Sequence, residues 1–182
     1  AGVTLTNAGT VTITSPTDPA APGGTETAAD ATTVDIVEPE LLTDKAAPAT
    51  FALPGETIQY TVTLSHAPGS TAAAYDIVLA DLLTDPNLEL VAGSVTASAG
   101  TVALGNGAGD TTVRVEVGVL PLGQVLTVTF TARVAATAPG GVTLVNEATS
   151  AFDSAGGPGG RPDGGTDGTQ VPIAPSLIKE VV

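Results

Sequence analysis

The stretch Thr57–Ser65 reads TIQYTVTLS, and its pattern decides the fold class. Apolar side chains occupy every second position, namely Ile58, Tyr60, Val62 and Leu64. Successive side chains of a β-strand point to opposite faces, so one face of this segment is expected to be buried and the other wet. The segment therefore predicts a half-buried β-strand.

The same period of two recurs in segments 112–119 and 124–134. Turn-forming Pro, Gly, Asn and Asp residues separate these segments, and further strands are expected at 73–79, 88–94 and 141–152. No window shows the apolar period and the caps of a helix. About seven antiparallel strands at this spacing predict an all-β protein, an immunoglobulin-like antiparallel β-sandwich.

The composition excludes several classes of function. The 182 residues contain no Cys, Met or Trp and one His, which rules out disulfides, thiol chemistry and Cys/His zinc sites. A net charge of −14 would repel nucleic acid and anionic membranes, and no apolar run reaches the roughly 18 residues of a membrane span. No catalytic triad or phosphate-binding glycine motif is visible, so an enzyme acting on an external substrate is not expected.

The chain contains part of itself twice. Residues 1–15 read AGVTLTNAGTVTITS and residues 140–154 read GGVTLVNEATSAFDS, so that Asn7, for example, recurs 139 positions later as Asn146. Such self-similarity marks a tandem array of small domains. The expected organisation is a last strand of a preceding repeat at 1–15, a Pro/Gly/acidic linker at 16–33, a complete sandwich repeat at 34–152, a Gly/Asp-rich linker at 153–170 and the first strand of a following repeat at 171–182.

Both end segments are expected to carry exposed apolar strand edges. The side chains concerned are Val3, Leu5, Val11 and Ile13 at one end and Ile173, Leu177 and Val181 at the other. Because exposed strand edges pair with available edges, the expected partners are neighbouring copies or repeats of the same kind.

Five motifs follow one another in a characteristic order. They are GETIQYTVTL at 55–64, AYDIVLAD at 74–81, LELVAGS at 88–94, VGVL at 117–120 and LVNEAT at 144–149. This order resembles the conserved-repeat domain of large bacterial and archaeal cell-surface proteins, an immunoglobulin-like family without an assigned function. The resemblance implies an extracellular structural module on the prokaryotic cell surface: a stalk, filament or surface-layer unit of an adhesin-like protein.

A ligand-binding adhesion module that recognises carbohydrate or protein is the alternative function. Sugar sites usually display exposed aromatic side chains. Here the three Phe and two Tyr residues lie mostly at positions with core-facing parity, which counts against this alternative.

Asn146 shares its strand parity with Leu144 and Ala148, so its amide is expected to point into the core. A buried amide needs partners, and two interpretations remain open. In one, neighbouring backbone groups bind it. In the other, found in related surface sandwiches, a first-strand lysine, here Lys45, forms an intramolecular isopeptide bond with the asparagine, and a buried, protonated Asp81 polarises the amide. No alternation around Lys45 fixes its direction, so a solvated lysine is also consistent with the sequence.

Acidic residues in the Gly/Pro-rich segment DSAGGPGGRPDGGTDG are candidates for a calcium site. Asp153, Asp163 and Asp167 supply carboxylates on flexible turns, and Ca²⁺ takes 6 to 8 oxygen ligands. The segment does not match an EF-hand, and a solvated linker is the alternative interpretation.

Overall fold

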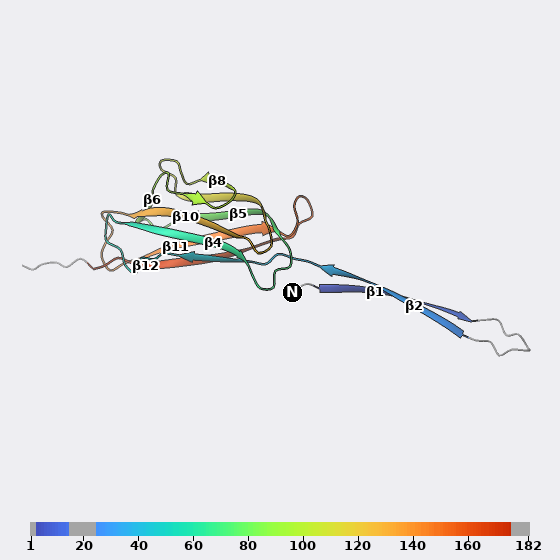
Figure 1. Ribbon diagram of the computed structural model, residues 1–182. Coiled ribbons are helices and arrows are strands. Elements are labelled where there is room, and N and C mark those ends of the chain that lie inside the picture. The colour runs from blue at the N-terminus through green and yellow to red at the C-terminus, as the bar shows by residue number, and fades with distance from the viewer. Residues whose placement is uncertain (1–2, 15–24, 176–182) are drawn as a thin grey trace, which may run out of the picture. The chain divides into compact units, whose positions relative to one another are not determined.

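The structure is a computed structural model that describes residues 3–14 and 25–175 (Figure 1). Every regular element within these ranges is a β-strand, which confirms the predicted all-β class. In the same part of the chain there is no helix that could cross a membrane. The chain divides into two units between Val37 and Glu38.

The first unit is a two-stranded ribbon of β1 (Val3–Thr14) and β2 (Thr25–Ile36). The strands pair antiparallel over their whole length, from Val3 opposite Ile36 to Thr14 opposite Thr25. The linker predicted at 16–33 is therefore wrong for residues 25–33, which read TETAADATT and pair with β1, so that the backbone groups of β1 are satisfied. Residues 16–24 of that linker lie outside the described residues.

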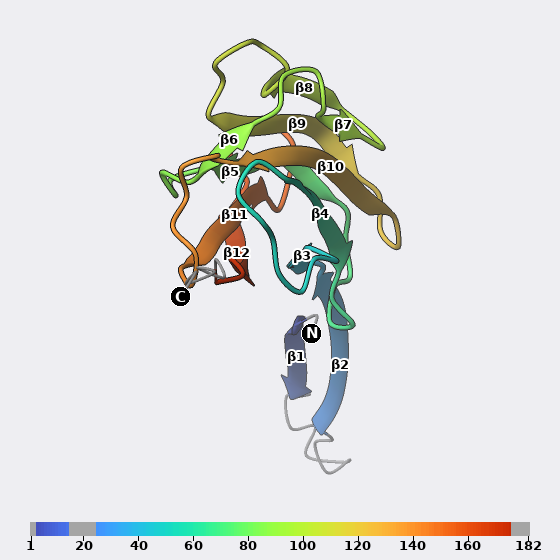
Figure 2. The same cartoon turned by 90° about the vertical axis from the view of Figure 1, so that its left-hand side faces the viewer.

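The second unit is a sandwich of two sheets (Figure 2). The first sheet contains β3 (Leu41–Ala46), β4 (Thr57–His66), β10 (Val125–Val134) and β6 (Leu88–Leu90), in that order, with β7 (Thr96–Ala97) also paired to β10. The second contains β12 (Pro162–Pro172), β11 (Thr143–Asp153), β5 (Ala74–Leu82), β9 (Thr112–Leu120) and β8 (Thr101–Leu104). All ladders in both sheets are antiparallel.

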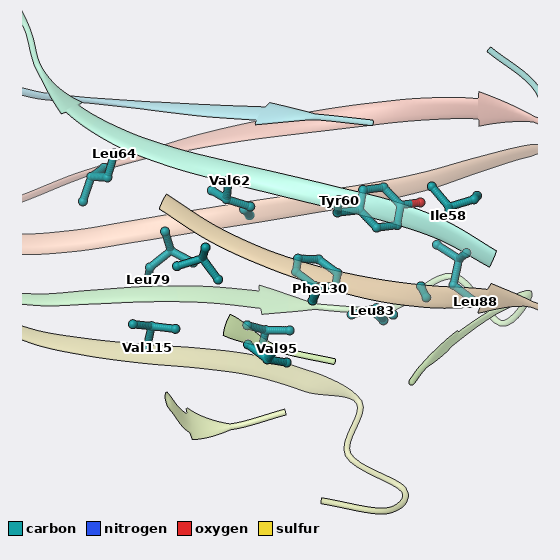
Figure 3. Packing of buried hydrophobic residues seen from close by; sticks show 14 of the residues in the cluster. Ile58, Tyr60, Val62, Leu64, Leu79, Leu83, Leu88, Val95, Val115 and Phe130 are labelled. Atoms are coloured by element: carbon teal, nitrogen blue, oxygen red, sulfur yellow. The ribbon is translucent and has the colours of Figure 1, made fainter. Parts of the chain in front are cut away.

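The core lies between the two sheets and is built from the predicted alternating faces. In β4 the four apolar side chains of the opening stretch are at most 1% exposed. Figure 3 shows Val62 and Leu64 near Leu79 on β5, Tyr60 beside Phe130 on β10 and Ile58 near Leu88 on β6, all members of one buried cluster. The half-buried strand predicted at 57–65 is thereby confirmed.

The segment after Asp153 differs from the prediction. Residues 162–172 form β12, which pairs with β11 over eleven positions, so the linker predicted at 153–170 is wrong for residues 162–170, while residues 154–161 form the loop between the two strands. Its glycines reflect close packing rather than flexibility, because a Cβ on Gly164 would lie 2.2 Å from the Ser150 carbonyl oxygen.

The boundaries of the repeat move accordingly. Val171 and Ile173 are each 1% exposed, so they complete this sandwich and do not begin a following repeat. The sandwich runs from β3 to β12 instead of from 34 to 152. Leu177 and Val181 lie outside the described residues.

Candidate functional site: a buried lysine, aspartate and asparagine

Three polar side chains lie in the core of the sandwich. Lys45 on β3, Asp81 on β5 and Asn146 on β11 are 5%, 1% and 2% exposed. Asp81 pairs across the ladder with Ala148, and Asn146 lies two residues from Ala148 on the same face. The register therefore brings the carboxyl and the amide together, and the core-facing parity predicted for both is confirmed.

Contacts between β3 and the facing sheet fix the position of Lys45. The backbone N–H of Lys45 donates to Oδ2 of Asp167 on β12 at 2.6 Å. The hydroxyls of Thr43 and Ser150 lie 2.7 Å apart and join β3 to β11. These contacts hold the edge strand β3 against β11 and β12, so that the Lys45 side chain enters the space between the sheets.

Nζ of Lys45 donates a hydrogen bond to Oδ2 of Asp81, and both side chains are fully buried. Burial lowers the pKa of Lys45 below its usual value, against the opposing effect of Asp81. Burial also raises the pKa of Asp81, against the opposing effect of Lys45. Both shifts favour the uncharged pair, a free amine beside a carboxylic acid.

Two stacked aromatic rings shield this pair from water. The centroids of Tyr60 and Phe130 are 5.3 Å apart, and Nζ of Lys45 lies 4.9 Å and 5.1 Å from them. Burial raises the pKa of Tyr60, so the phenol stays protonated. The rings supply the apolar wall that keeps the amine desolvated.

Asn146 has no conventional partner. Its Nδ2 and Oδ1 atoms and Oδ1 of Asp81 are buried without a hydrogen bond. The amide lies close enough to Asp81 to contribute to lowering the pKa of that carboxyl, but without normal hydrogen-bond geometry. The structure thus lacks the backbone hydrogen bonds of the first interpretation. Each buried polar group without a hydrogen bond destabilises the folded state by about 1–3 kcal/mol. The folded protein is therefore destabilised as long as the Asn146 amide stays unreacted.

The three carboxylates predicted to bind calcium do not converge. Asp153 lies opposite Pro162 at one end of the ladder, whereas Asp167 lies opposite Ala148. Asp163 and Asp167 are four residues apart in an extended strand, about 13 Å, and Ca²⁺ ligands lie at about 2.3–2.6 Å. In the described ranges 3–14 and 25–175, no three His, Cys, Asp or Glu side chains are grouped to hold a metal. The prediction of this calcium site is therefore corrected.

Asp167 has a structural role that the sequence did not indicate. Its acidic, glycine-rich surroundings suggest a calcium ligand, but its carboxylate accepts a hydrogen bond from the backbone of Lys45. A signal is nevertheless present in the sequence, because Asp167 recurs as Asp30, 137 positions earlier.

A scan against protein-family models finds no match, and a search of curated proteins finds none either. The resemblance to the conserved-repeat family therefore rests on the sequence motifs. Several solved structures do match the chain in fold.

The major pilin subunit BcpA of Bacillus cereus aligns with a TM-score of 0.50 and 15% identity, over 80% of this chain and 45% of that chain. A protein of Corynebacterium diphtheriae described as membrane-anchored aligns with a TM-score of 0.50 and 9% identity, over 84% and 42%. AvmM, which catalyses macrocyclisation in alchivemycin A biosynthesis, aligns with a TM-score of 0.44 and 12% identity, over 78% and 94%. At 15% and 9% identity, the two alignments with a TM-score of 0.50 show the fold alone, a β-sandwich that is also present in the pilin subunit BcpA. The chain spans less than half the length of the first two proteins.

Proposed function

We propose that this chain is a structural module of a bacterial surface filament or stalk, closed covalently by an amide bond between Lys45 and Asn146. The observation that carries the proposal is the buried Asn146 amide, which makes no regular hydrogen bond and lies beside the buried side chains of Lys45 and Asp81. The shared fold with BcpA, a major pilin subunit, supports the surface role. An extracellular location is part of the same proposal.

The residues have complementary roles in this reaction. The neutral Nζ of Lys45 attacks Cγ of Asn146, while protonated Asp81 donates a hydrogen bond to the amide oxygen and makes the carbon more electrophilic. The new C–N bond forms as the bond to Nδ2 breaks, and Asp81 relays a proton from the amine to the departing nitrogen. The products are a secondary amide and ammonia, and the chain is its own substrate.

The bond would give the sandwich resistance to mechanical load. It connects the first strand, β3, to the penultimate strand, β11, across the two sheets. When the ends are pulled, force passes through the amide and bypasses the 101 positions from Lys45 to Asn146. About 350 Å of chain, at roughly 3.5 Å per residue, is then withheld from extension.

The exposed aromatic side chains give little support to the alternative function, a sugar-binding module. Of the five aromatic side chains, Tyr60, Phe130 and Phe152 are buried and Tyr75 is half-buried. Phe51 is the exposed one, at 58%. A single exposed ring does not make the aromatic platform that such sites usually display.

Intact mass and single-molecule force measurements test the two parts of the proposal. The chain should weigh about 17 Da less than its sequence mass, the mass of one ammonia, and Asp81→Ala should restore the full mass. Under force, the wild-type sandwich should release about 350 Å less chain than Asp81→Ala. A full sequence mass for the wild type refutes the bond, and equal extension of both proteins refutes the mechanical role.

A further inference from the structure

The ribbon β1–β2 repeats the last hairpin of the sandwich, β11–β12, in its strand register as well as in its sequence. The repeated sequence places residue 7 of β1 at the position of residue 146 of β11. The cross-strand partners then coincide too. Equivalent pairs are Leu5–Val34 and Leu144–Val171, Asn7–Thr32 and Asn146–Thr169, and Gly9–Asp30 and Ala148–Asp167.

The residues that are identical between β2 and β12, the second strands of the two hairpins, lie on one face of the strand. With the offset of 137 that the register imposes, the identical residues are Asp30, Thr32, Val34 and Ile36 in one copy and Asp167, Thr169, Val171 and Ile173 in the other. These are alternate positions, and in the sandwich they face the core or the neighbouring strand β3. What the two hairpins share is therefore a docking face.

This face is buried in one copy and exposed in the other. Leu144 and Val171 are each 1% exposed, whereas their counterparts Leu5 and Val34 are 54% and 60% exposed. A paired ribbon with an exposed apolar face is marginal in water on its own. The ribbon thus carries the features of a closing hairpin whose sandwich is a different one from residues 38–175.

We propose that β1–β2 is the closing hairpin of a second sandwich of the same fold, and that its Asn7 is a second cross-linking site. A second copy of this chain is a poor host, because its own β11–β12 already fills the equivalent place. The ribbon's apolar face instead packs against another sandwich domain. That domain has strands equivalent to β3–β10 but lacks the hairpin equivalent to β11–β12. Asp30 would bind the backbone of the first strand of that body, as Asp167 does here.

The covalent part rests on the reaction proposed for Asn146. A lysine of the host body, at the place of Lys45, attacks Cγ of Asn7 with its neutral Nζ. A C–N bond forms, the bond from Cγ to Nδ2 breaks, and the amine proton passes through the aspartic acid at the place of Asp81 to the leaving ammonia. The ribbon would then be joined to its host by an amide.

A two-module chain tests the docking. Residues 38–140 are fused directly before residues 2–182, so that the added body precedes the ribbon as residues 38–140 precede β11. The protein has no cysteine, so a single Leu5→Cys thiol reports on the docking face. Thr6→Cys is the matched control, because Thr6 corresponds to Val145, which stays 49% exposed in the complete sandwich. A tandem of two copies of residues 38–175 establishes that the body folds in such a fusion.

Docking predicts that the Leu5→Cys thiol reacts at least about tenfold more slowly in the fused chain than in residues 1–182. The Thr6→Cys thiol should react equally fast in both. Equal rates for Leu5→Cys in the two chains, while the tandem control folds, would overturn the docking.

Intact mass tests the chemistry separately. The fused chain should lose two molecules of ammonia, and Asn7→Ala should reduce this to one. A protected Leu5→Cys thiol with the loss of a single ammonia overturns the cross-link at Asn7. Loss of no ammonia at all refutes the reaction proposed for Asn146 as well, while the labelling result still decides the docking.

Discussion

Replacing Asn146 by alanine is expected to lower the free energy of unfolding of the sandwich by about 5 kcal/mol. The proposed amide bond between Lys45 and Asn146 would close a loop of 101 positions. By chain entropy, a cross-link that closes a loop of this length destabilises the unfolded state by about 4.7 kcal/mol. In a domain of this size, each kcal/mol shifts the melting temperature by about 2–4 °C, so the variant should melt about 10–20 °C lower.

Other effects of the substitution are smaller or have the opposite sign. Removing an unpaired buried amide would by itself stabilise the uncross-linked protein. Asp81→Asn serves as a matched variant, because it keeps Asn146 in place but removes the acid that the reaction needs. Thr169→Val serves as a control that keeps the bond, since Oγ1 of Thr169 is another buried atom without a partner.

Thermal and urea unfolding, with intact mass measured on the same samples, provide the assay. Asn146→Ala and Asp81→Asn should both show the full sequence mass and both lose stability, and Asp81→Asn should lose at least as much because it also leaves Lys45 without its buried acidic partner. Thr169→Val should keep the reduced mass and at least the wild-type melting temperature. The reasoning fails if either uncross-linked variant melts within about 2 °C of the wild type.

Two further predictions concern the charge and the packing of the sandwich. In Lys45→Met, burial still raises the pKa of Asp81, so the folded state keeps a proton that the unfolded state releases above about pH 4. Its stability should therefore fall by up to about 1.4 kcal/mol per pH unit from pH 4 up to the folded pKa, a slope that urea titrations should find absent from the double variant with Asp81→Asn. Gly164→Ala should destabilise the sandwich by about 1–3 kcal/mol, because its Cβ would meet the Ser150 carbonyl oxygen at 2.2 Å. Gly118→Ala, with open space around its Cβ, should change the melting temperature little, and equal effects of the two would contradict the packing argument.

The strands that form the core could be predicted from the sequence because their faces differ. In β4 the apolar residues alternate with Thr and Gln, and period two is a direct consequence of strand geometry. The same rule placed Asp81 and Asn146 in the core. Alternation with period two predicts a strand and its buried face wherever one face of the strand is buried and the other is exposed to water.

β12 could not be found in this way, because its sequence lacks apolar alternation before Val171. Its backbone packs too closely on β11 for large side chains, so several of its positions are glycines. A glycine-rich sequence without apolar alternation is typical of a linker, and the strand is therefore missed. The direction of Lys45 was equally hidden. It depends on a contact with Asp167, 122 positions away, and local sequence carries no trace of such a contact.

The two cross-links together predict how an array of these modules would extend. If amides form at Asn7 and at Lys45, the backbone that carries load between them is the 38 positions from residue 7 to residue 45, which include the ribbon. Asn7 lies opposite Thr32, near the end at which β2 leads on to β3, so force enters and leaves the ribbon at the same end. The hairpin would then open one pair at a time, which requires less force than shearing all pairs at once. Force spectroscopy on the fused chain should show a low-force step of about 130 Å, at roughly 3.5 Å per residue, and Asn7→Ala should replace it by a longer extension. A fused chain with both amides confirmed by mass, but without this step, would show that the ribbon is not the extensible part of the module.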